Sequence, residues 1–233
     1  GRAIRDSKYK RGGRMPFYPL IDWGWEREKC ASYIREVLGV EWEKSACIYC
    51  PYALQNRAGR ARVLSLYDKD PATALLALEL EFLSISLNPV QGLMGGNRLL
   101  DLLIQEGRST VLEEFRRHVE SLPWALYDVR RVLWARRDNP TKIGGAARRL
   151  QTFATGTRKE MISLLRSMPG ELDTTDGIPP FYNIERVWLR RRGNTPDTAE
   201  WFRVAAPKGA EDKEGPRFQE AWDAVTSERS TLR

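Results

Sequence analysis

Cysteine and histidine are scarce in this sequence of 233 residues, which contains three cysteines and one histidine. Cys30, Cys47 and Cys50 all lie in one short stretch, and no cysteine follows them. An odd number of thiols argues against a disulfide framework and favours a reducing compartment, so we expect a cytoplasmic protein. Because soft ligands of one metal must converge on one point, thiols gathered in this way indicate a metal or cluster site.

Long apolar runs are also absent. The sequence has no stretch of eighteen apolar residues, and it does not open with a charged segment followed by an apolar one and a cleavage site. These absences predict no membrane span and give no indication of secretion. A chain of this length can bury a substantial core in one or two domains.

Positive charge is abundant and unevenly distributed. The formal net charge is +7, and residues 130–166 carry ten basic side chains against Asp138 and Glu160. Concentrated positive charge attracts polyanions, so this stretch predicts nucleic-acid binding, although solvated helix faces would give the same pattern. The candidate nucleic-acid-binding residues are paired along the chain: Arg130, Arg131, Arg148 and Arg149.

Periodicity predicts a mainly α protein with a small late β element. The apolar stripe over 26–38 indicates a helix, and Asp70-Pro71 should open a long helix that Asn88-Pro89 ends. Alternation over 184–190 indicates a strand, with 201–205 as its partner. Further helices are expected at about 97–106, 110–121, 123–137, 144–154 and 157–167, and a short one near the C-terminus.

Several chemistries could use the cysteines. A structural zinc site normally needs four ligands, and His118, in a predicted helix far along the sequence, is a poor candidate for the fourth. A thioredoxin-type dithiol would follow a strand, and residues 41–44 do not look like one. Three thiolates can hold three corners of a [4Fe–4S] cluster, which suits the count better. Alternatively, Cys30 is a packed residue on the apolar stripe of its helix.

Residues 16–53 resemble the phosphoadenosine phosphosulfate reductase-like family, a branch of the PP-loop ATP pyrophosphatases. The resemblance lies in three segments: Tyr18-Pro19-Leu20-Ile21-Asp22-Trp23-Gly24-Trp25, Arg27-Glu28-Lys29-Cys30, and Lys44-Ser45-Ala46-Cys47-Ile48-Tyr49-Cys50-Pro51-Tyr52. It continues more weakly to about residue 93. The resemblance implies a nucleotide-activating enzyme, a sulfurtransferase or oxidoreductase. Members of the family reduce activated sulfate or transfer sulfur, and some thiolate nucleic acids.

The family's phosphate-binding loop, Ser-Gly-Gly-x-Asp-Ser, does not occur in this sequence. We therefore expect residue 1 to lie inside a longer enzyme, with ATP or adenylyl sulfate bound mainly by an upstream domain. The fold expected from the resemblance is the C-terminal portion of an α/β PP-loop enzyme, similar to the adenine nucleotide alpha hydrolases. The chain by itself should not be active.

This interpretation divides the chain into four parts. They are a basic arm (1–16), a cysteine-bearing segment (17–95), a basic helical region (96–168) and a loop-rich C-terminal region (169–233). The expected ligands of an iron–sulfur cluster are Cys30, Cys47 and Cys50. The expected substrate-binding residues are Arg5, Lys8, Arg14, Asp22, Trp23 and Lys44. The alternative function is a non-catalytic helical module that binds nucleic acid, with structural cysteines.

Overall fold

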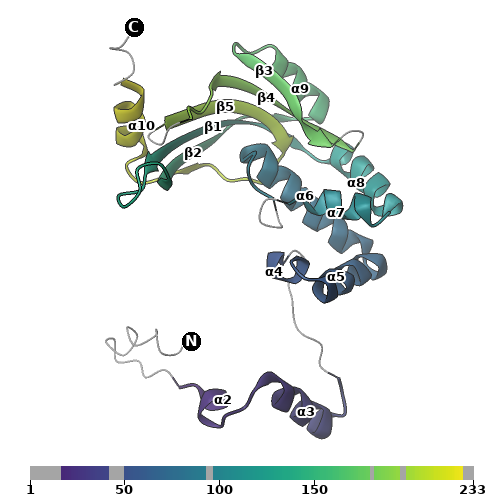
Figure 1. The fold of residues 1–233 in the computed structure, drawn as a ribbon. Helices are drawn as coiled ribbons and strands as arrows, with labels where there is room; N and C mark the ends of the chain where they lie inside the picture. Colours follow the sequence, from purple (N-terminus) through teal and green to yellow (C-terminus); the bar gives the residue numbers. More distant parts are fainter. Residues whose placement is uncertain (1–16, 42–49, 93–96, 179–180, 195–197, 228–233) are drawn as a thin grey trace. The chain divides into compact units, whose positions relative to one another are not determined.

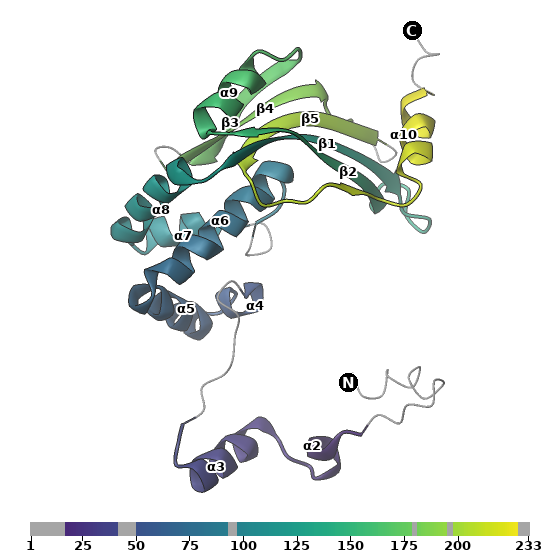
Figure 2. The ribbon, with the colours of Figure 1, turned by 180° about the vertical axis from the view of Figure 1, so that it is seen from behind.

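The computed structural model describes residues 17–41, 50–92, 97–178, 181–194 and 198–227. The chain separates into two compact units, Gly1–Ala46 and Cys47–Arg233. Figure 1 and Figure 2 show the elements of each unit from opposite sides.

The first unit contains two helices, α2 (Pro19–Asp22) and α3 (Arg27–Leu38), so the helix predicted over 26–38 is confirmed. Gly39 ends α3 in the left-handed conformation, with φ of 66°, which glycine adopts without strain. No residue of either helix is buried. Trp25 lies between Trp23 and Tyr33, with ring centroids 5.7 Å and 5.1 Å away.

The second unit begins with helices. They are α4 (Pro51–Leu54), α5 (Arg57–Lys69), α6 (Pro71–Leu87), α7 (Leu99–Gln105) and α8 (Ser109–Ser121). The predicted helices at 70–87, 97–106 and 110–121 correspond to α6, α7 and α8. The sequence interpretation did not identify α5, where the Asn56 side chain accepts a hydrogen bond from the backbone N–H of Gly59 at 2.8 Å and caps the helix.

In the described part of this unit, six strands form one antiparallel sheet in the order β3-β4-β5-β1-β2-β6. The strands are β1 (Trp124–Ala135), β2 (Ile143–Gly156), β3 (Glu171–Ile178), β4 (Tyr182–Arg190), β5 (Thr198–Pro207) and β6 (Lys213–Glu214). Helix α9 (Arg158–Arg166) connects β2 to β3, and α10 (Phe218–Ser227) follows β6. The predicted pairing of 184–190 with 201–205, the helix at 157–167 and the last helix are confirmed.

The expectation of a mainly α protein is wrong, because the fold is mixed α/β with an extensive sheet. The helices predicted at 123–137 and 144–154 are the strands β1 and β2. Strand β1 lies in the middle of the sheet and is buried along most of its length. A strand covered on both faces has no clean apolar–polar alternation, so its sequence is easily mistaken for a buried helix.

Helices cover both faces of the sheet. Helix α6 lies on one face, with α8 packed against it, and α9 and α10 lie on the other, as Figure 1 and Figure 2 show. The first face, called the α6 face below, includes Arg131 and Phe202; the second, called the α9 face, includes Arg130 and Trp201. Consecutive residues of a strand point to opposite faces, so neighbouring arginines of one strand have different surroundings.

A buried carboxylate joins α6 to α7. Glu81 is 1% exposed, and its two carboxylate oxygens accept hydrogen bonds from the backbone N–H groups of Leu99 and Leu100, at 2.7 and 3.1 Å. These N–H groups begin α7 and have no acceptor within that helix, so Glu81 supplies the acceptors that the helix start lacks. Burial raises the pKa of Tyr67 above its ordinary value, and the negative charge of Glu81 adds a smaller contribution in the same direction.

None of the helices in the described part of the chain has both the length and the apolar character needed to cross a bilayer.

Candidate functional site

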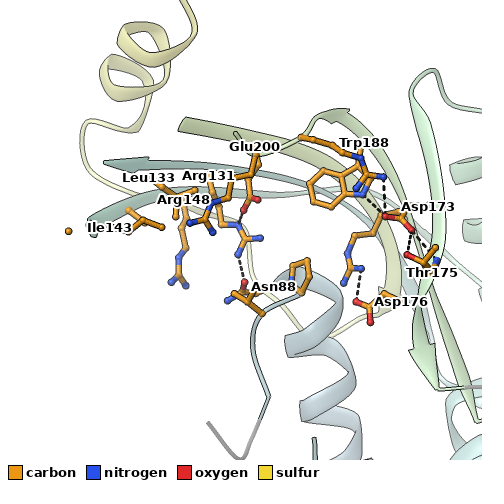
Figure 3. Close-up of a pocket in the computed structure, with 18 residues that line it drawn as sticks. Asn88, Arg131, Leu133, Ile143, Arg148, Asp173, Thr175, Asp176, Trp188 and Glu200 are labelled. Carbon is orange, nitrogen blue, oxygen red and sulfur yellow. Dashed lines mark hydrogen bonds and ion pairs between the residues drawn. The ribbon is translucent and has the colours of Figure 1, made fainter. Parts of the chain in front are cut away.

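The described part of the second unit contains an open cleft of about 810 Å³. It lies between the C-terminal end of α6 and the α6 face of the sheet, and the start of β2 and part of β3 also line it (Figure 3). Five arginines and three acidic residues line the cleft. They are Arg131, Arg148, Arg186, Arg191 and Arg192, with Asp173, Asp176 and Glu200.

Arg186 belongs to the framework of the cleft. Its side chain is 2% exposed, and it donates hydrogen bonds to the carbonyl oxygens of Ile85 at 2.7 Å and Ser86 at 3.2 Å. It also donates to Asp176 at 2.8 Å. The last carbonyl groups of a helix have no partner within the helix and form its negative end, so Arg186 neutralises the end of α6 that faces the cleft.

Arg131 is held in a similar way. Its guanidinium forms an ion pair with Glu200, its cross-strand neighbour on β5, and donates a hydrogen bond to the side-chain oxygen of Asn88. Burial lowers the pKa of Arg131, Glu200 opposes that change, and the positive charge of Arg148 lowers the pKa further. Arg131 and Arg148 therefore repel each other across the β1–β2 pair.

The acidic residues of β3 are also committed to partners. Asp173 accepts hydrogen bonds from the backbone and hydroxyl of Thr175, from the indole of Trp188 at 3.2 Å and from Arg191 at 3.1 Å. The hydrogen bond from the Thr175 hydroxyl is the largest cause that lowers the pKa of Asp173, which falls from 3.8 to about 2. Asp173 therefore stays ionised at neutral pH and balances Arg191.

Asp176 accepts hydrogen bonds from two arginines, Arg98 at 2.7 Å and Arg186 at 2.8 Å. Burial by itself would raise the pKa of Asp176, but the hydrogen bonds from Arg186 and Arg98 leave it lower than its ordinary value. The two β3 carboxylates that line the cleft, Asp173 and Asp176, are thus charged and paired at neutral pH.

Two arginines of the cleft differ from the other three. Arg148 and Arg192 are exposed, and neither forms an ion pair with a carboxylate within the described part of the chain. Five positive and three negative side chains line the cleft, which leaves two positive charges uncompensated. Arg148 and Arg192 are therefore the groups that can bind an external anion without breaking an internal ion pair.

The four arginines that the sequence indicated as nucleic-acid-binding lie in two pairs, on opposite faces of the sheet. Arg131 and Arg148 are cross-strand partners on the α6 face, whereas Arg130 and Arg149 are partners on the α9 face. Arg130 lies 4.0 Å from the ring centroid of Trp201 and donates to Asp128 at 3.0 Å, and Arg149 pairs with Glu214 at 3.1 Å. They do not form the single positive helix face that we expected, because the segments that carry them are strands.

The cysteines and the expected substrate-binding residues are only partly described. Cys30 in α3 and Cys50 just before α4 are half-buried and form no disulfide. Asp22 and Trp23 are exposed residues of the first unit. Cys47, Lys44, Arg5, Lys8 and Arg14 lie outside the described residues.

Among the described residues, no three His, Cys, Asp or Glu side chains are placed so that they could hold a metal ion. Three thiolates would suit an iron–sulfur cluster by their chemistry. Because Cys47 is not described, the three-cysteine site stays a prediction.

Sequence reasoning missed most of the cleft. Arg186, Arg191, Arg192, Asp173, Asp176 and Glu200 were not candidates, although Arg190-Arg191-Arg192 is a conspicuous basic run at the end of a correctly predicted strand. Such a run could have indicated an anion site. Nothing in the sequence shows which of these arginines is neutralised, because their partners are far away along the chain.

Comparisons of this chain with known protein families, with curated proteins and with solved structures gave no match.

Proposed function

We propose that the unit Cys47–Arg233 binds a phosphate-bearing ligand, a nucleotide or nucleic acid, in the arginine cleft. In this proposal it is the substrate-binding part of a phosphoadenosine phosphosulfate reductase-like enzyme of sulfur transfer or sulfate reduction. The observation that carries the proposal is the pair of uncompensated arginines, Arg148 and Arg192, in a cleft whose other charges are internally paired.

The electrostatics of the cleft support an anionic ligand. The C-terminal end of a helix normally repels anions, but Arg186 covers the last carbonyl groups of α6. Arginine presents a planar set of donors that matches phosphate oxygens, and it stays charged at all physiological pH values. Phosphate groups can therefore bind Arg148 or Arg192 while the ion pairs of Arg131, Arg186 and Arg191 remain in place.

The arginine cleft is tested by reversing its two uncompensated charges. In the double variant Arg148→Glu/Arg192→Glu, we expect binding of fluorescein-labelled 20-nucleotide DNA or RNA at 100 mM salt to weaken by at least about tenfold. The slope of log affinity against log salt should become shallower, because fewer counterions are released. Fluorescence anisotropy measures both quantities, and circular dichroism checks that the fold is retained.

A matched control makes the same change in net charge outside the cleft. Arg117 on α8 and Lys159 on α9 are exposed and do not line the cleft. The variant Arg117→Glu/Lys159→Glu should retain most of the affinity. Equal loss in both double variants would show that net charge alone drives binding, and would contradict a site in the cleft.

The cysteine-bearing segment supplies the second part of the proposal. Cys30, Cys47 and Cys50 would be the ligands of a cluster, which would provide electron-transfer or sulfur-transfer chemistry when bound. After anaerobic purification, we expect a brown protein with broad absorption near 400 nm, roughly as iron–sulfur proteins show. Cys47→Ser should remove both iron and colour, whereas Ser45→Ala, two residues earlier, should change neither.

The same experiment separates the two candidate functions. A colourless protein without iron that still binds nucleic acid through Arg148 and Arg192 would favour the alternative, a non-catalytic nucleic-acid-binding module. The cleft itself supports this alternative function, because it needs no cluster to bind an anion. Its arginines lie on strands or just beyond the end of β4, so the binding surface would be a sheet rather than the helical surface that we first expected.

A further inference from the structure

Exposed apolar side chains line the cleft together with the uncompensated arginines. Val90, in the turn that follows α6, is 76% exposed, and Ile143, the first residue of β2, is 39% exposed. Both line the same cavity as Arg148. Figure 3 shows Ile143, Leu133 and Arg148 close together at one end of the cleft, away from Asp173 and Asp176.

This combination limits the kind of phosphate ligand that fits. A duplex presents phosphates and sugars on its outside and keeps its base faces stacked inside, so it offers no base face to Val90 and Ile143. A single strand offers phosphates and the faces of unstacked bases within the same few ångströms. A mononucleotide offers both groups, but only one base, and would leave much of an open cleft of about 810 Å³ unoccupied.

We propose that the cleft binds a segment of single-stranded nucleic acid, with Arg148 and Arg192 on its phosphates and its bases against Val90 and Ile143. This inference rests on the proposed function and names the ligand class of the same site. The other end of the cleft should not bind phosphate, because Asp173 and Asp176 are ionised there and their arginines are already paired. The strand should therefore extend from Arg148 on β2 to Arg192, just beyond the end of β4, without placing a phosphate beside Asp173 or Asp176.

The test compares four ligands on the full wild-type chain: a 20-nucleotide single strand of DNA, the same sequence as RNA, the corresponding duplex, and ATP. We expect both single strands to bind at least about tenfold more tightly than the duplex at 150 mM salt. ATP should compete only at far higher concentration. A duplex that binds as tightly as the single strands, or ATP that binds comparably well, would overturn the inference.

A second variant tests the apolar contacts separately from the charges. Val90→Ser/Ile143→Ser should weaken single-strand binding by about threefold to tenfold without changing the salt dependence, because no phosphate contact is lost. Its weak binding of the duplex should not change. Unchanged single-strand binding in this variant would show that Val90 and Ile143 do not contact bases, and would contradict the inference.

The two proposals fail in different ways. If Arg148→Glu/Arg192→Glu binds every ligand as the wild type does, the proposed function itself is wrong. If that variant loses binding but the wild type does not prefer single strands, the anion site stands and only the ligand class is wrong.

Discussion

Replacing Glu81 by alanine should destabilise the second unit by about 3 kcal/mol or more, since a buried carboxylate that accepts two backbone hydrogen bonds leaves both donors unsatisfied when it is removed. Glu81 connects the middle of α6 to the first residues of α7 and is 1% exposed, so its two hydrogen bonds lie in the core. Urea unfolding followed by circular dichroism measures the loss as a lower midpoint.

Glu79 provides the matched control on the same helix. Its carboxylate is partly exposed and pairs with His118 at 2.8 Å, so Glu79→Ala should cost less than about 1 kcal/mol. Glu81→Gln, which keeps one acceptor oxygen, should lie between the two alanine variants. If Glu81→Ala and Glu79→Ala had the same midpoint, the buried carboxylate would not be supporting the start of α7.

Replacing Arg186 by methionine should cost about 3–5 kcal/mol, because the change breaks a buried ion pair and leaves charged and polar partners unsatisfied. The variant removes the donors to the Ile85 and Ser86 carbonyls at the end of α6 and one of the two arginines that pair with Asp176. Methionine keeps the volume and removes the charge, so the loss is mainly electrostatic. The cleft should lose its shape along with its stability, since Arg186 connects α6 to β3 and β4.

Two comparisons test this reason. Arg191→Met removes an arginine whose side chain is 46% exposed. Its partner Glu171 is exposed, and its other partner Asp173 keeps the hydrogen bonds from Thr175 and Trp188. The variant should therefore change stability by less than about 1 kcal/mol. Asp176→Asn in the Arg186→Met background should restore part of the loss, because it removes the carboxylate that has lost one of its arginines. A similar cost for both methionine variants, with no recovery in the double variant, would contradict a structural role for this ion pair.

Local signals explain the elements that the sequence predicted correctly. Asp70-Pro71 and Asn88-Pro89 bracket α6, and Thr157 forms a capping box with Glu160 at the start of α9. The strand over 184–190 was predictable because its apolar and polar residues alternate. Each of these signals acts over a few residues, through a proline that cannot continue a helix or a side chain that caps one.

The centre of the sheet could not be predicted in this way. Strand β1 pairs with both β2 and β5 and packs against α9 and α10, so its burial depends on later segments, of which β5 and α10 are far away along the sequence. In β2, Gly144, Gly145 and Ala146 carry almost no side-chain signal for a strand. Tertiary packing therefore decided whether the basic segment from 123 to 154 became helix or sheet, and packing outweighs local propensity.

The sequence by itself determined that positive charge is concentrated in residues 1–14 and 130–166, and that the thiols lie in one short segment. Only the tertiary structure decided what each arginine does. Arg130 and Arg131 are adjacent in the sequence, yet one stacks on Trp201 and the other pairs with Glu200 in the cleft, because neighbours on a strand face opposite sides. Arg148 is uncompensated in the described structure because the carboxylates that reach the cleft, from β3 and β5, pair with other arginines.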